Sequence, residues 1–135
     1  MEAHDAVVDE TAKHVMVVED HEETREFYSR LLVRSGVRVS TASNCAEALR
    51  EASRLQPRLI VMDMHLPDVD GWECIRQLRL DPRTKEIPIL AVSGYASEAD
   101  RKKALALGAA DYLVKPVQPE LLLRSLRRWL DVPPR

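Results

Sequence analysis

The sequence contains few cysteines and no long apolar run. Its only cysteines are Cys45 and Cys74, and two thiols in what look like separate helical segments do not make a disulfide framework. We expect both to be buried, reduced thiols. No apolar segment approaches the roughly 18 residues needed to cross a bilayer, and residues 1–12 lack the apolar core of a signal peptide. These absences predict a cytoplasmic location.

The chain also lacks an excess of charge of either sign. Twenty Lys and Arg residues against 22 Asp and Glu residues give a formal net charge of −2. This balance provides no overall field that would attract nucleic acid or an anionic membrane. The sequence has no glycine-rich phosphate loop, and its four histidines do not have metal-ligand spacing. We therefore expect no direct nucleic-acid contact and no membrane contact.

What is present fits one soluble globular domain of 135 residues, with 45% hydrophobic and 31% charged residues. From about residue 14, five short apolar runs alternate with amphipathic helical stretches, which indicates an α/β fold with a parallel sheet. We expect a flexible leader at 1–12, the domain at 13–131 and a tail at 132–135. The expected strands are 14–18, 37–41, 58–62, 89–92 and 111–114. The expected helices are one ending near Gly36, one between a cap at Ser43 or Asn44 and Pro57, and those at 71–80, 97–107 and from about 119.

Polar side chains follow four of these strands at the point where each strand ends. Glu19 and Asp20 follow the first strand, Asp63 the third, Ser93 the fourth and Lys115 the fifth. In open parallel sheets, ligands bind at the carboxyl ends of the strands, so these side chains converge if their strands are neighbours. Three carboxylates would repel one another there, and Mg²⁺ relieves the repulsion because it accepts oxygen ligands. A hydroxyl and an ammonium opposite the acids suit an anionic phosphoryl group.

Taken singly, each of these residues has an ordinary structural explanation. An Asp after a buried strand is often a turn residue, and Glu19-Asp20 could cap the first helix. Ser93 could be a loop hydroxyl and Lys115 a solvated charge. Only the joint spacing of these residues favours a functional site.

The stretches VVED, LIVMDMHLPDVDG, LAVSG and GAADYLVKP closely resemble the signatures of the receiver domain of two-component response regulators. The resemblance covers about residues 13–131, and the spacing of Asp20, Asp63, Ser93 and Lys115 is typical of that family. It implies a flavodoxin-like, doubly wound, five-stranded parallel sheet with the strand order 2-1-3-4-5. It also implies a cis peptide bond between Lys115 and Pro116.

By the same resemblance, Asp63 accepts a phosphoryl group in a reaction that requires Mg²⁺. The group would come from the phosphohistidine of a sensor histidine kinase or from a phosphotransfer protein. Such a chain is a signalling domain that assists its own phosphorylation and dephosphorylation, and not an enzyme in the usual sense. The resemblance assigns the metal site to Glu19, Asp20, Asp63 and the backbone carbonyl of His65, and the phosphoryl contacts to Ser93 and Lys115.

The resemblance further implies a switch and a lifetime control. Ser93 would shift toward a phosphoryl group on Asp63 and vacate space that Tyr112, the expected switch aromatic, can fill. In this family the side chains at the positions of His65 and Tyr95 influence the lifetime of the phosphorylated state. Both are bulky here, so they could shield the acyl phosphate from water.

Output is expected on the face formed by helix 97–107, strand 111–114 and the last helix, the usual partner-binding face of receivers. The basic run 101–103 and Ala110 depart from the alternating acid and base pattern of the best-known receiver dimers, so like charges oppose that pairing. We expect a monomer, or a dimer of another geometry, that presents this face to an acidic output partner.

Two other functions are compatible with the fold. A receiver-like module could bind partners without phosphorylation, but the complete set of acidic, hydroxyl and ammonium residues argues against it. An aspartyl-phosphate hydrolase would normally have a second acid two residues after its nucleophile, and this chain has His65 there.

Overall fold

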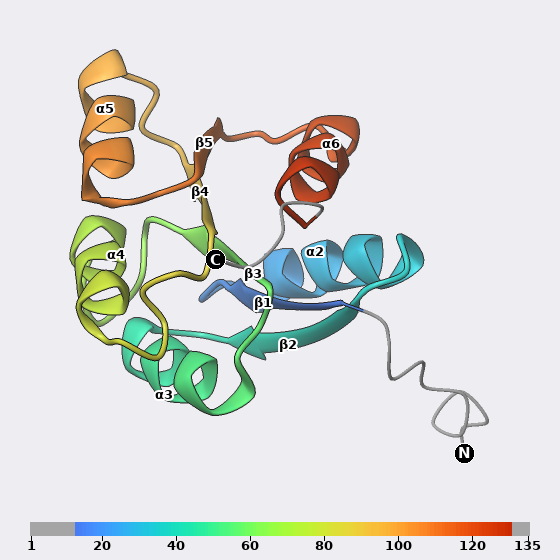
Figure 1. The fold of residues 1–135 in the computed structure, drawn as a ribbon. Coiled ribbons are helices and arrows are strands. Elements are labelled where there is room, and N and C mark those ends of the chain that lie inside the picture. The colour runs from blue at the N-terminus through green and yellow to red at the C-terminus, as the bar shows by residue number, and fades with distance from the viewer. Residues whose placement is uncertain (1–12, 131–135) are drawn as a thin grey trace.

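The computed structural model of the protein describes residues 13–130, which form a five-stranded parallel sheet between two layers of helices (Figure 1). The order of the strands along the sheet is β2-β1-β3-β4-β5. The predicted flavodoxin-like order is therefore confirmed. The strands are β1 (His14–Val18), β2 (Arg38–Ala42), β3 (Leu59–Asp63), β4 (Ile89–Ser93) and β5 (Asp111–Val114).

The continuous apolar runs of the sequence occupy the centre of the sheet. Every residue of β3 and of β4 is buried, as expected for parallel strands that helices cover on both faces. β2 lies at one edge, and most of its side chains are only half-buried or exposed. The central strands therefore provide a rigid base for the loops that leave their carboxyl ends.

Two helices, α2 (Glu22–Arg34) and α6 (Pro119–Leu130), cover one face of the sheet (Figure 1). The other face is covered by α3 (Cys45–Leu55), α4 (Gly71–Leu80) and α5 (Glu98–Leu107). All five predicted helices are present, and their bounds differ from the expected ones by only a few residues at either end.

Alternate residues of each strand contribute to two separate apolar cores. Val15 and Val17 of β1 belong to the core that Tyr28 of α2 and Leu126 of α6 complete. The intervening Met16 faces the core on the side of α3, α4 and α5. This alternation follows from the period of two in a strand.

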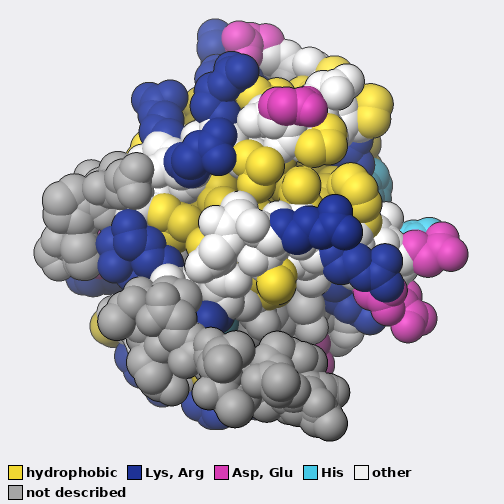
Figure 2. All heavy atoms as spheres, turned by 90° about the vertical axis from the view of Figure 1, so that its right-hand side faces the viewer, with side chains coloured by type: hydrophobic (Ala, Val, Ile, Leu, Met, Phe, Trp, Pro, Cys, Tyr) yellow, Lys and Arg dark blue, Asp and Glu magenta, His cyan; other side chains and the backbone are white. Residues whose placement is uncertain are grey.

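The face formed by α2 and α6 also exposes apolar side chains. Figure 2 shows a gathering of hydrophobic side chains on this side of the molecule, with Lys and Arg side chains around it. Phe27 and Val33 of α2 and Leu121 of α6 are among the large apolar residues that remain exposed.

Helix ends follow the capping signals in the sequence. Asn44, and not Ser43, is the N-cap of α3, and Gly36 and Gly108 adopt the positive φ angles that let the chain leave α2 and α5. Asn44, Asp70 and Ser97 each satisfy an otherwise unpaired amide of the first helical turn. These side chains accept hydrogen bonds from the backbone N–H groups of Glu47, Glu73 and Asp100, respectively.

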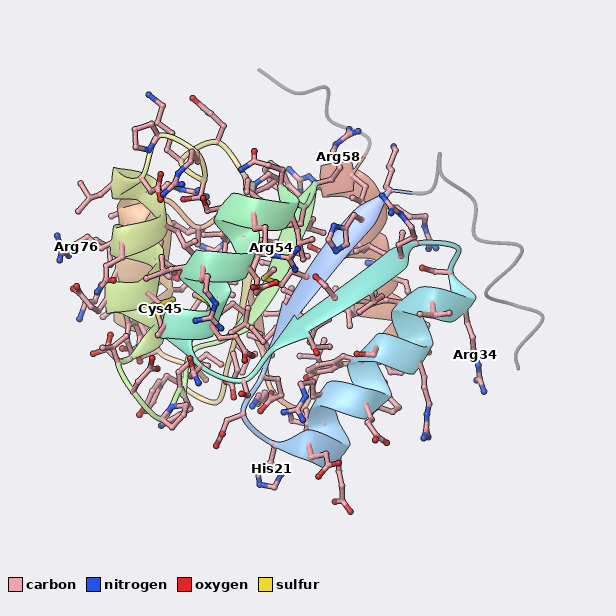
Figure 3. The ribbon with its side chains drawn as sticks, turned by 90° about the horizontal axis from the view of Figure 1, so that it is seen from below. His21, Arg34, Cys45, Arg54, Arg58 and Arg76 are labelled. Atoms are coloured by element: carbon pink, nitrogen blue, oxygen red, sulfur yellow. A yellow bond between two sulfur atoms is a disulfide. The ribbon has the colours of Figure 1, made fainter. Side chains whose placement is uncertain are left out.

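The expectation that Cys45 and Cys74 are reduced thiols is wrong for this structure. A disulfide joins them between α3 and α4, with their Cα atoms 5.8 Å apart (Figure 3). Such a bond requires Cα atoms closer than about 7 Å, and only the packing of α3 against α4 creates that proximity. The sequence places the two cysteines in separate helices but does not show that these helices are neighbours.

The predicted leader at 1–12 and tail at 132–135 lie outside the described residues, as does residue 131 at the predicted domain end. Across 13–130, the helices are all too short or too polar to span a membrane.

Candidate functional site

The carboxyl ends of four strands bring Glu19, Asp63, Ser93 and Lys115 to one edge of the sheet. β1 and β3 are direct neighbours, and so are β3 and β4 and then β4 and β5. The parallel register places Ser93 opposite Val114, the residue before Lys115. The convergence expected from the strand ends therefore occurs.

Asp63, the last residue of β3, lies at the centre of this cluster. Its side chain is nearly enclosed, with 6% of the residue exposed. The Lys115 ammonium lies 3.2 Å from Asp63 Oδ2, and the backbone N–H of His65 donates a hydrogen bond of 3.2 Å to Oδ1. The carboxylate is thus held in place while one edge of it faces a cation.

Glu19 is the other buried acid of the site, with 2% of its surface exposed. Its Oε2 accepts a hydrogen bond from the His21 N–H, but Oε1 is buried and has no hydrogen-bond partner. Burial raises the pKa of Glu19, the His21 N–H opposes that rise, and the nearby Asp63 carboxylate adds to it. The Lys115 ammonium lies 3.8 Å from Oε1 and lowers the pKa only in part. Glu19 therefore lacks sufficient positive charge around it.

This shortage of positive charge fits a site for a hard cation. An orphaned carboxylate oxygen next to a second buried carboxylate is the donor chemistry that Mg²⁺ prefers. Asp20 follows Glu19 directly but is exposed. Within residues 13–130, no three His, Cys, Asp or Glu side chains are arranged as a complete metal cage. The structure thus brings Glu19 and Asp63 together and leaves Asp20 at the rim.

Ser93 and Lys115 border the same carboxylates from β4 and β5. Ser93 is completely buried, and its hydroxyl oxygen accepts a hydrogen bond of 2.9 Å from the Tyr95 N–H. The backbone N–H of Lys115 donates to the Ser93 carbonyl at 2.8 Å, and the Lys115-Pro116 peptide bond is cis. The backbone therefore fixes where the lysine side chain leaves the sheet.

A comparison of the sequence with known families agrees with this geometry. The response regulator receiver domain matches residues 15–127. The chain belongs to this family. The receiver domain is a signalling domain, and membership implies a phosphoacceptor role in two-component signalling.

Individual relatives and solved structures support the assignment. The chain is 32% identical to the polar-differentiation response regulator DivK of Brucella anthropi, over 87% of this chain and 96% of the relative. The structure of the chemotaxis response regulator CheY4 of Vibrio cholerae is similar, with a TM-score of 0.83, 33% identity and coverage of 88% and 99%. The receiver domain of a Pseudomonas aeruginosa sensor histidine kinase, solved with a magnesium ion coordinated in its active site cleft, has a TM-score of 0.82 and 31% identity, with coverage of 90% and 100%.

Several relatives are longer than this chain. The chain is 40% identical to the KDP operon transcriptional regulatory protein KdpE of Escherichia coli over 76% of its own length, but this covers only 44% of that regulator. The chain thus spans less than half the length of this regulator.

Two aromatic side chains approach each other beside the acidic site of this receiver. The Tyr95 hydroxyl lies 2.7 Å from His65 Nε2, and the two ring centroids are 4.8 Å apart. Tyr95 also packs on Trp72 of α4, at a centroid distance of 5.5 Å, and the Lys103 ammonium lies over the Trp72 ring. The loops after β3 and β4 are therefore joined by side chains. The sequence singled out His65 and Tyr95 but gave no sign of Trp72.

Tyr112 is connected to the same loop. Its ring is buried, and its hydroxyl donates a hydrogen bond of 2.7 Å to the Tyr95 carbonyl. The ring on β5 is thus in direct contact with the loop that begins at Ser93. The structure shows this inward position, and a switching role for Tyr112 remains a proposal.

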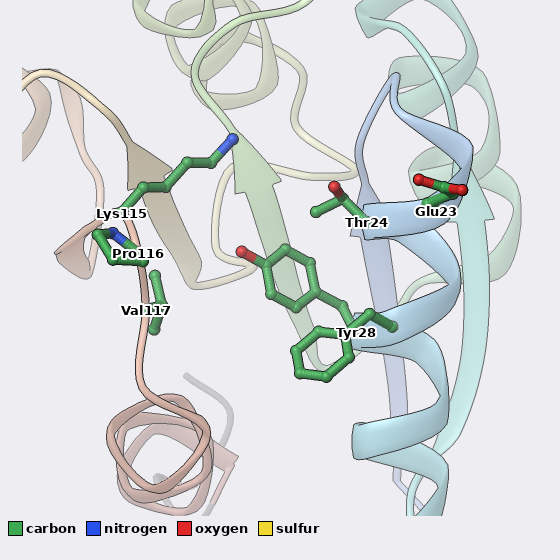
Figure 4. Close-up of a pocket in the computed structure, with 7 residues that line it drawn as sticks. Glu23, Thr24, Tyr28, Lys115, Pro116 and Val117 are labelled. Atoms are coloured by element: carbon green, nitrogen blue, oxygen red, sulfur yellow. The ribbon is translucent and has the colours of Figure 1, made fainter.

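A pocket of about 540 Å³ opens beside Lys115, between α2 and the loop that follows β5 (Figure 4). Tyr28 lies in it with its hydroxyl toward the lysine side of the pocket (Figure 4). Burial raises the pKa of Tyr28, and the Glu19 and Asp63 carboxylates raise it further, so the hydroxyl keeps its proton. In the sequence, Tyr28 has the spacing of an ordinary core residue, and no motif distinguishes it. The residues that line the pocket are Glu23, Thr24, Phe27, Tyr28, Lys115, Pro116 and Val117.

Proposed function

We propose that this receiver accepts a phosphoryl group on Asp63 from the phosphohistidine of a sensor histidine kinase or phosphotransfer protein and thereby changes its binding to an output partner. The observation that carries the proposal is the buried Asp63 carboxylate, held at a strand end between the Lys115 ammonium and Glu19. A structural turn residue would need neither a cation partner within ion-pair distance nor a second buried acid.

The chemistry is a transfer between two nucleophiles. An Asp63 oxygen attacks phosphorus, the bond from phosphorus to the donor imidazole breaks, and the imidazole leaves with the electron pair and takes up a proton. Lys115 and Ser93 then hold the phosphoryl oxygens by charge and hydrogen bonding. Mg²⁺, held by Glu19, Asp20, Asp63 and the His65 carbonyl, would supply the charge that neutralises these oxygens.

Direct labelling tests this proposal. The protein is incubated with acetyl phosphate and Mg²⁺, and intact-mass and peptide mass spectrometry follow the gain of one phosphoryl group. We expect labelling at Asp63 alone. An unlabelled protein would instead support the module that binds partners without phosphorylation, and continuous release of phosphate at high turnover would support the hydrolase.

The kinase or phosphotransfer protein is proposed to approach from the side of the pocket between α2 and the loop after β5. This pocket is adjacent to Lys115 and contains the exposed ring of Phe27, of which 51% is accessible. An exposed aromatic ring beside polar groups is typical of residues that anchor protein contacts.

Replacement of Asp20 by Asn is expected to weaken Mg²⁺ binding by roughly ten- to a hundredfold, the usual cost of losing a group that supports a metal site. Asp20 is exposed, so the fold should remain intact. Titration of Mg²⁺ followed by Trp fluorescence measures the affinity, and Glu120→Gln, an exposed acid on α6, is the control. Equal Mg²⁺ affinities of Asp20→Asn and Glu120→Gln would show that Asp20 does not contribute to Mg²⁺ binding.

The His65–Tyr95 contact is expected to slow loss of the phosphoryl group. Tyr95→Phe keeps the ring but removes the hydroxyl that contacts His65 Nε2, and His65→Ala removes the partner. One hydrogen bond contributes about 0.5–1.5 kcal/mol, so we expect dephosphorylation to become roughly two- to tenfold faster in each variant. Decay of labelled protein after removal of the donor gives the rate. Decay at the parental rate in both variants would exclude shielding by this pair.

The proposed output face is basic. Arg101, Lys102 and Lys103 on α5 are exposed, whereas the carboxylate of Asp111 is engaged by the Ser125 hydroxyl and the Tyr112 N–H. The Asp111 carboxylate keeps its negative charge, and this one acid of β5 offsets only part of the positive charge of the three cations. We propose that an acidic partner binds here and that two copies repel each other on this face.

Sedimentation is accordingly expected to show a monomer both with and without beryllofluoride, a phosphoryl mimic. Tyr112 would exchange between its buried position and an exposed one, with the mimic shifting an existing equilibrium. Arg128 is an exposed cation of α6, the last helix of this face. A tight dimer that is lost in Arg128→Glu would show that like charge does not prevent pairing on this face.

A further inference from the structure

The disulfide between α3 and α4 lies at the base of the loop that follows Asp63. Cys45 and Cys74 are both buried, and they are the only cysteines of the chain. Figure 3 shows the sulfur–sulfur bond next to Cys45, between the two helices. We propose that this pair is a reversible oxidation site whose state controls the order of residues 64–70 and, through them, phosphoryl uptake at Asp63. The second part rests on the proposed function.

Both anchors of this loop are attached to the helices that the disulfide joins. Asp68, within the loop, accepts hydrogen bonds from the backbone N–H groups of Cys45 and Ala46, at 3.0 and 2.9 Å. These amides belong to the first turn of α3. At the other anchor, the N–H of Gly71, the first residue of α4, donates to the Met64 carbonyl at 2.8 Å. The loop therefore contacts both α3 and α4, and its Asp68 contacts persist only while those helices keep their separation, whereas Met64 is held independently by its N–H bond to the Val92 carbonyl.

The crosslink lies at the same level of the helices as these anchors. Cys45 is the first residue of α3, and Cys74 lies within the first turn of α4. Its cleavage would allow the two helix starts to separate. The Asp68 contacts would then open more often, because no other hydrogen bond to α3 is described for the loop within residues 13–130. The loop carries His65, whose N–H holds Asp63.

The chemistry is a two-electron exchange. A thiol reductant attacks one sulfur, the Cys45–Cys74 bond breaks, and a second equivalent releases the mixed disulfide, which gives two protein thiols and one oxidised reductant disulfide. Reoxidation by a low-molecular-weight disulfide such as oxidised glutathione reverses these steps. Since both sulfur atoms are buried, attack requires partial separation of α3 from α4, and exchange should be slow.

In a reducing compartment, structural disulfides are uncommon, and those that form are mostly transient or redox-sensing. There the pair would be a dithiol until oxidants accumulate. Oxidation to the disulfide would then order residues 64–70 beside Asp63 and favour phosphoryl uptake. The same receiver would therefore respond both to its kinase and to redox conditions.

The test compares the oxidised and reduced forms of the unaltered protein, prepared with oxidised glutathione and with dithiothreitol. Alkylation of the denatured protein counts thiols, hydrogen exchange with mass spectrometry follows residues 64–74, and acetyl phosphate with Mg²⁺ measures uptake. In the reduced form we expect two thiols, several-fold faster exchange in this segment and several-fold slower uptake. The double variant Cys45→Ala/Cys74→Ala, which has no thiol, should respond to neither reagent.

Several outcomes would overturn the proposal. Two free thiols after exposure to oxidised glutathione would show that the pair does not oxidise. Identical hydrogen exchange of residues 64–74 in both forms would show that the disulfide does not control the order of the loop. If hydrogen exchange differs but phosphoryl uptake does not, the disulfide has only a structural role. Absence of uptake in both forms would refute the phosphoacceptor function itself, and the exchange measurement would still decide whether the bond controls the loop.

Discussion

Asp63→Asn is expected to abolish phosphoryl uptake. The amide is nearly isosteric with the carboxylate but cannot form an acyl phosphate. The contact of 3.2 Å between the Lys115 ammonium and Asp63 Oδ2 would become a hydrogen bond from a cation to an uncharged amide oxygen. Incubation with acetyl phosphate and Mg²⁺, followed by intact-mass spectrometry, should detect no labelled protein under conditions that label the parent fully.

The same variant should keep its fold. Asp63 and Glu19 are two buried acids, and the Asp63 carboxylate raises the pKa of Glu19, so removal of one charge relieves repulsion between them. We expect the free energy of unfolding to remain equal or to increase slightly. Asp20→Asn is the matched control, because its labelling should recover at high Mg²⁺ whereas that of Asp63→Asn should not. Labelling of Asp63→Asn at the parental rate would disprove the assignment of the phosphoacceptor.

Gly71→Ala is expected to cause the largest loss of stability among single small substitutions near the site. A Cβ atom on Gly71 would lie 2.5 Å from the backbone Cα of Met64 and 2.6 Å from its sulfur. The backbone of Met64 cannot move away freely, because it follows the central strand β3 and its N–H donates to the Val92 carbonyl. Overpacking of this kind typically costs about 1–3 kcal/mol.

Urea denaturation measures this cost, with Gly94→Ala as the control. A Cβ atom on Gly94 meets no heavy atom within 4 Å, so its effect should stay within about 0.5 kcal/mol. Gly71→Ala should also weaken Mg²⁺ binding, because the displaced Met64 lies between Asp63 and His65. Equal free energies of unfolding for Gly71→Ala and Gly94→Ala would show that the loop containing Met64 shifts to accommodate the added methyl group.

Much of the fold could be predicted because its signals are local. Apolar runs with polar ends defined β1, β3, β4 and β5 to within about a residue, and helical periodicity defined the helices between them. The strand ends also identified Glu19, Asp63, Ser93 and Lys115 as neighbours, since the carboxyl ends of adjacent parallel strands meet at one edge. The order of the strands came from family resemblance, because the apolar pattern does not state which strand lies beside which.

Only the tertiary structure shows which segments that are distant in the chain contact one another. The pairing of Cys45 with Cys74, the capping of α3 by Asp68 and the contact of Tyr95 with His65 all join residues 22–30 positions apart. Likewise, Glu19 is buried and Asp20 exposed although they are adjacent. Composition and periodicity determine which face of an element is apolar. The relative placement of α3, α4 and the loops after β3 and β4 depends instead on side-chain packing across the whole domain, and that packing determines which polar groups meet.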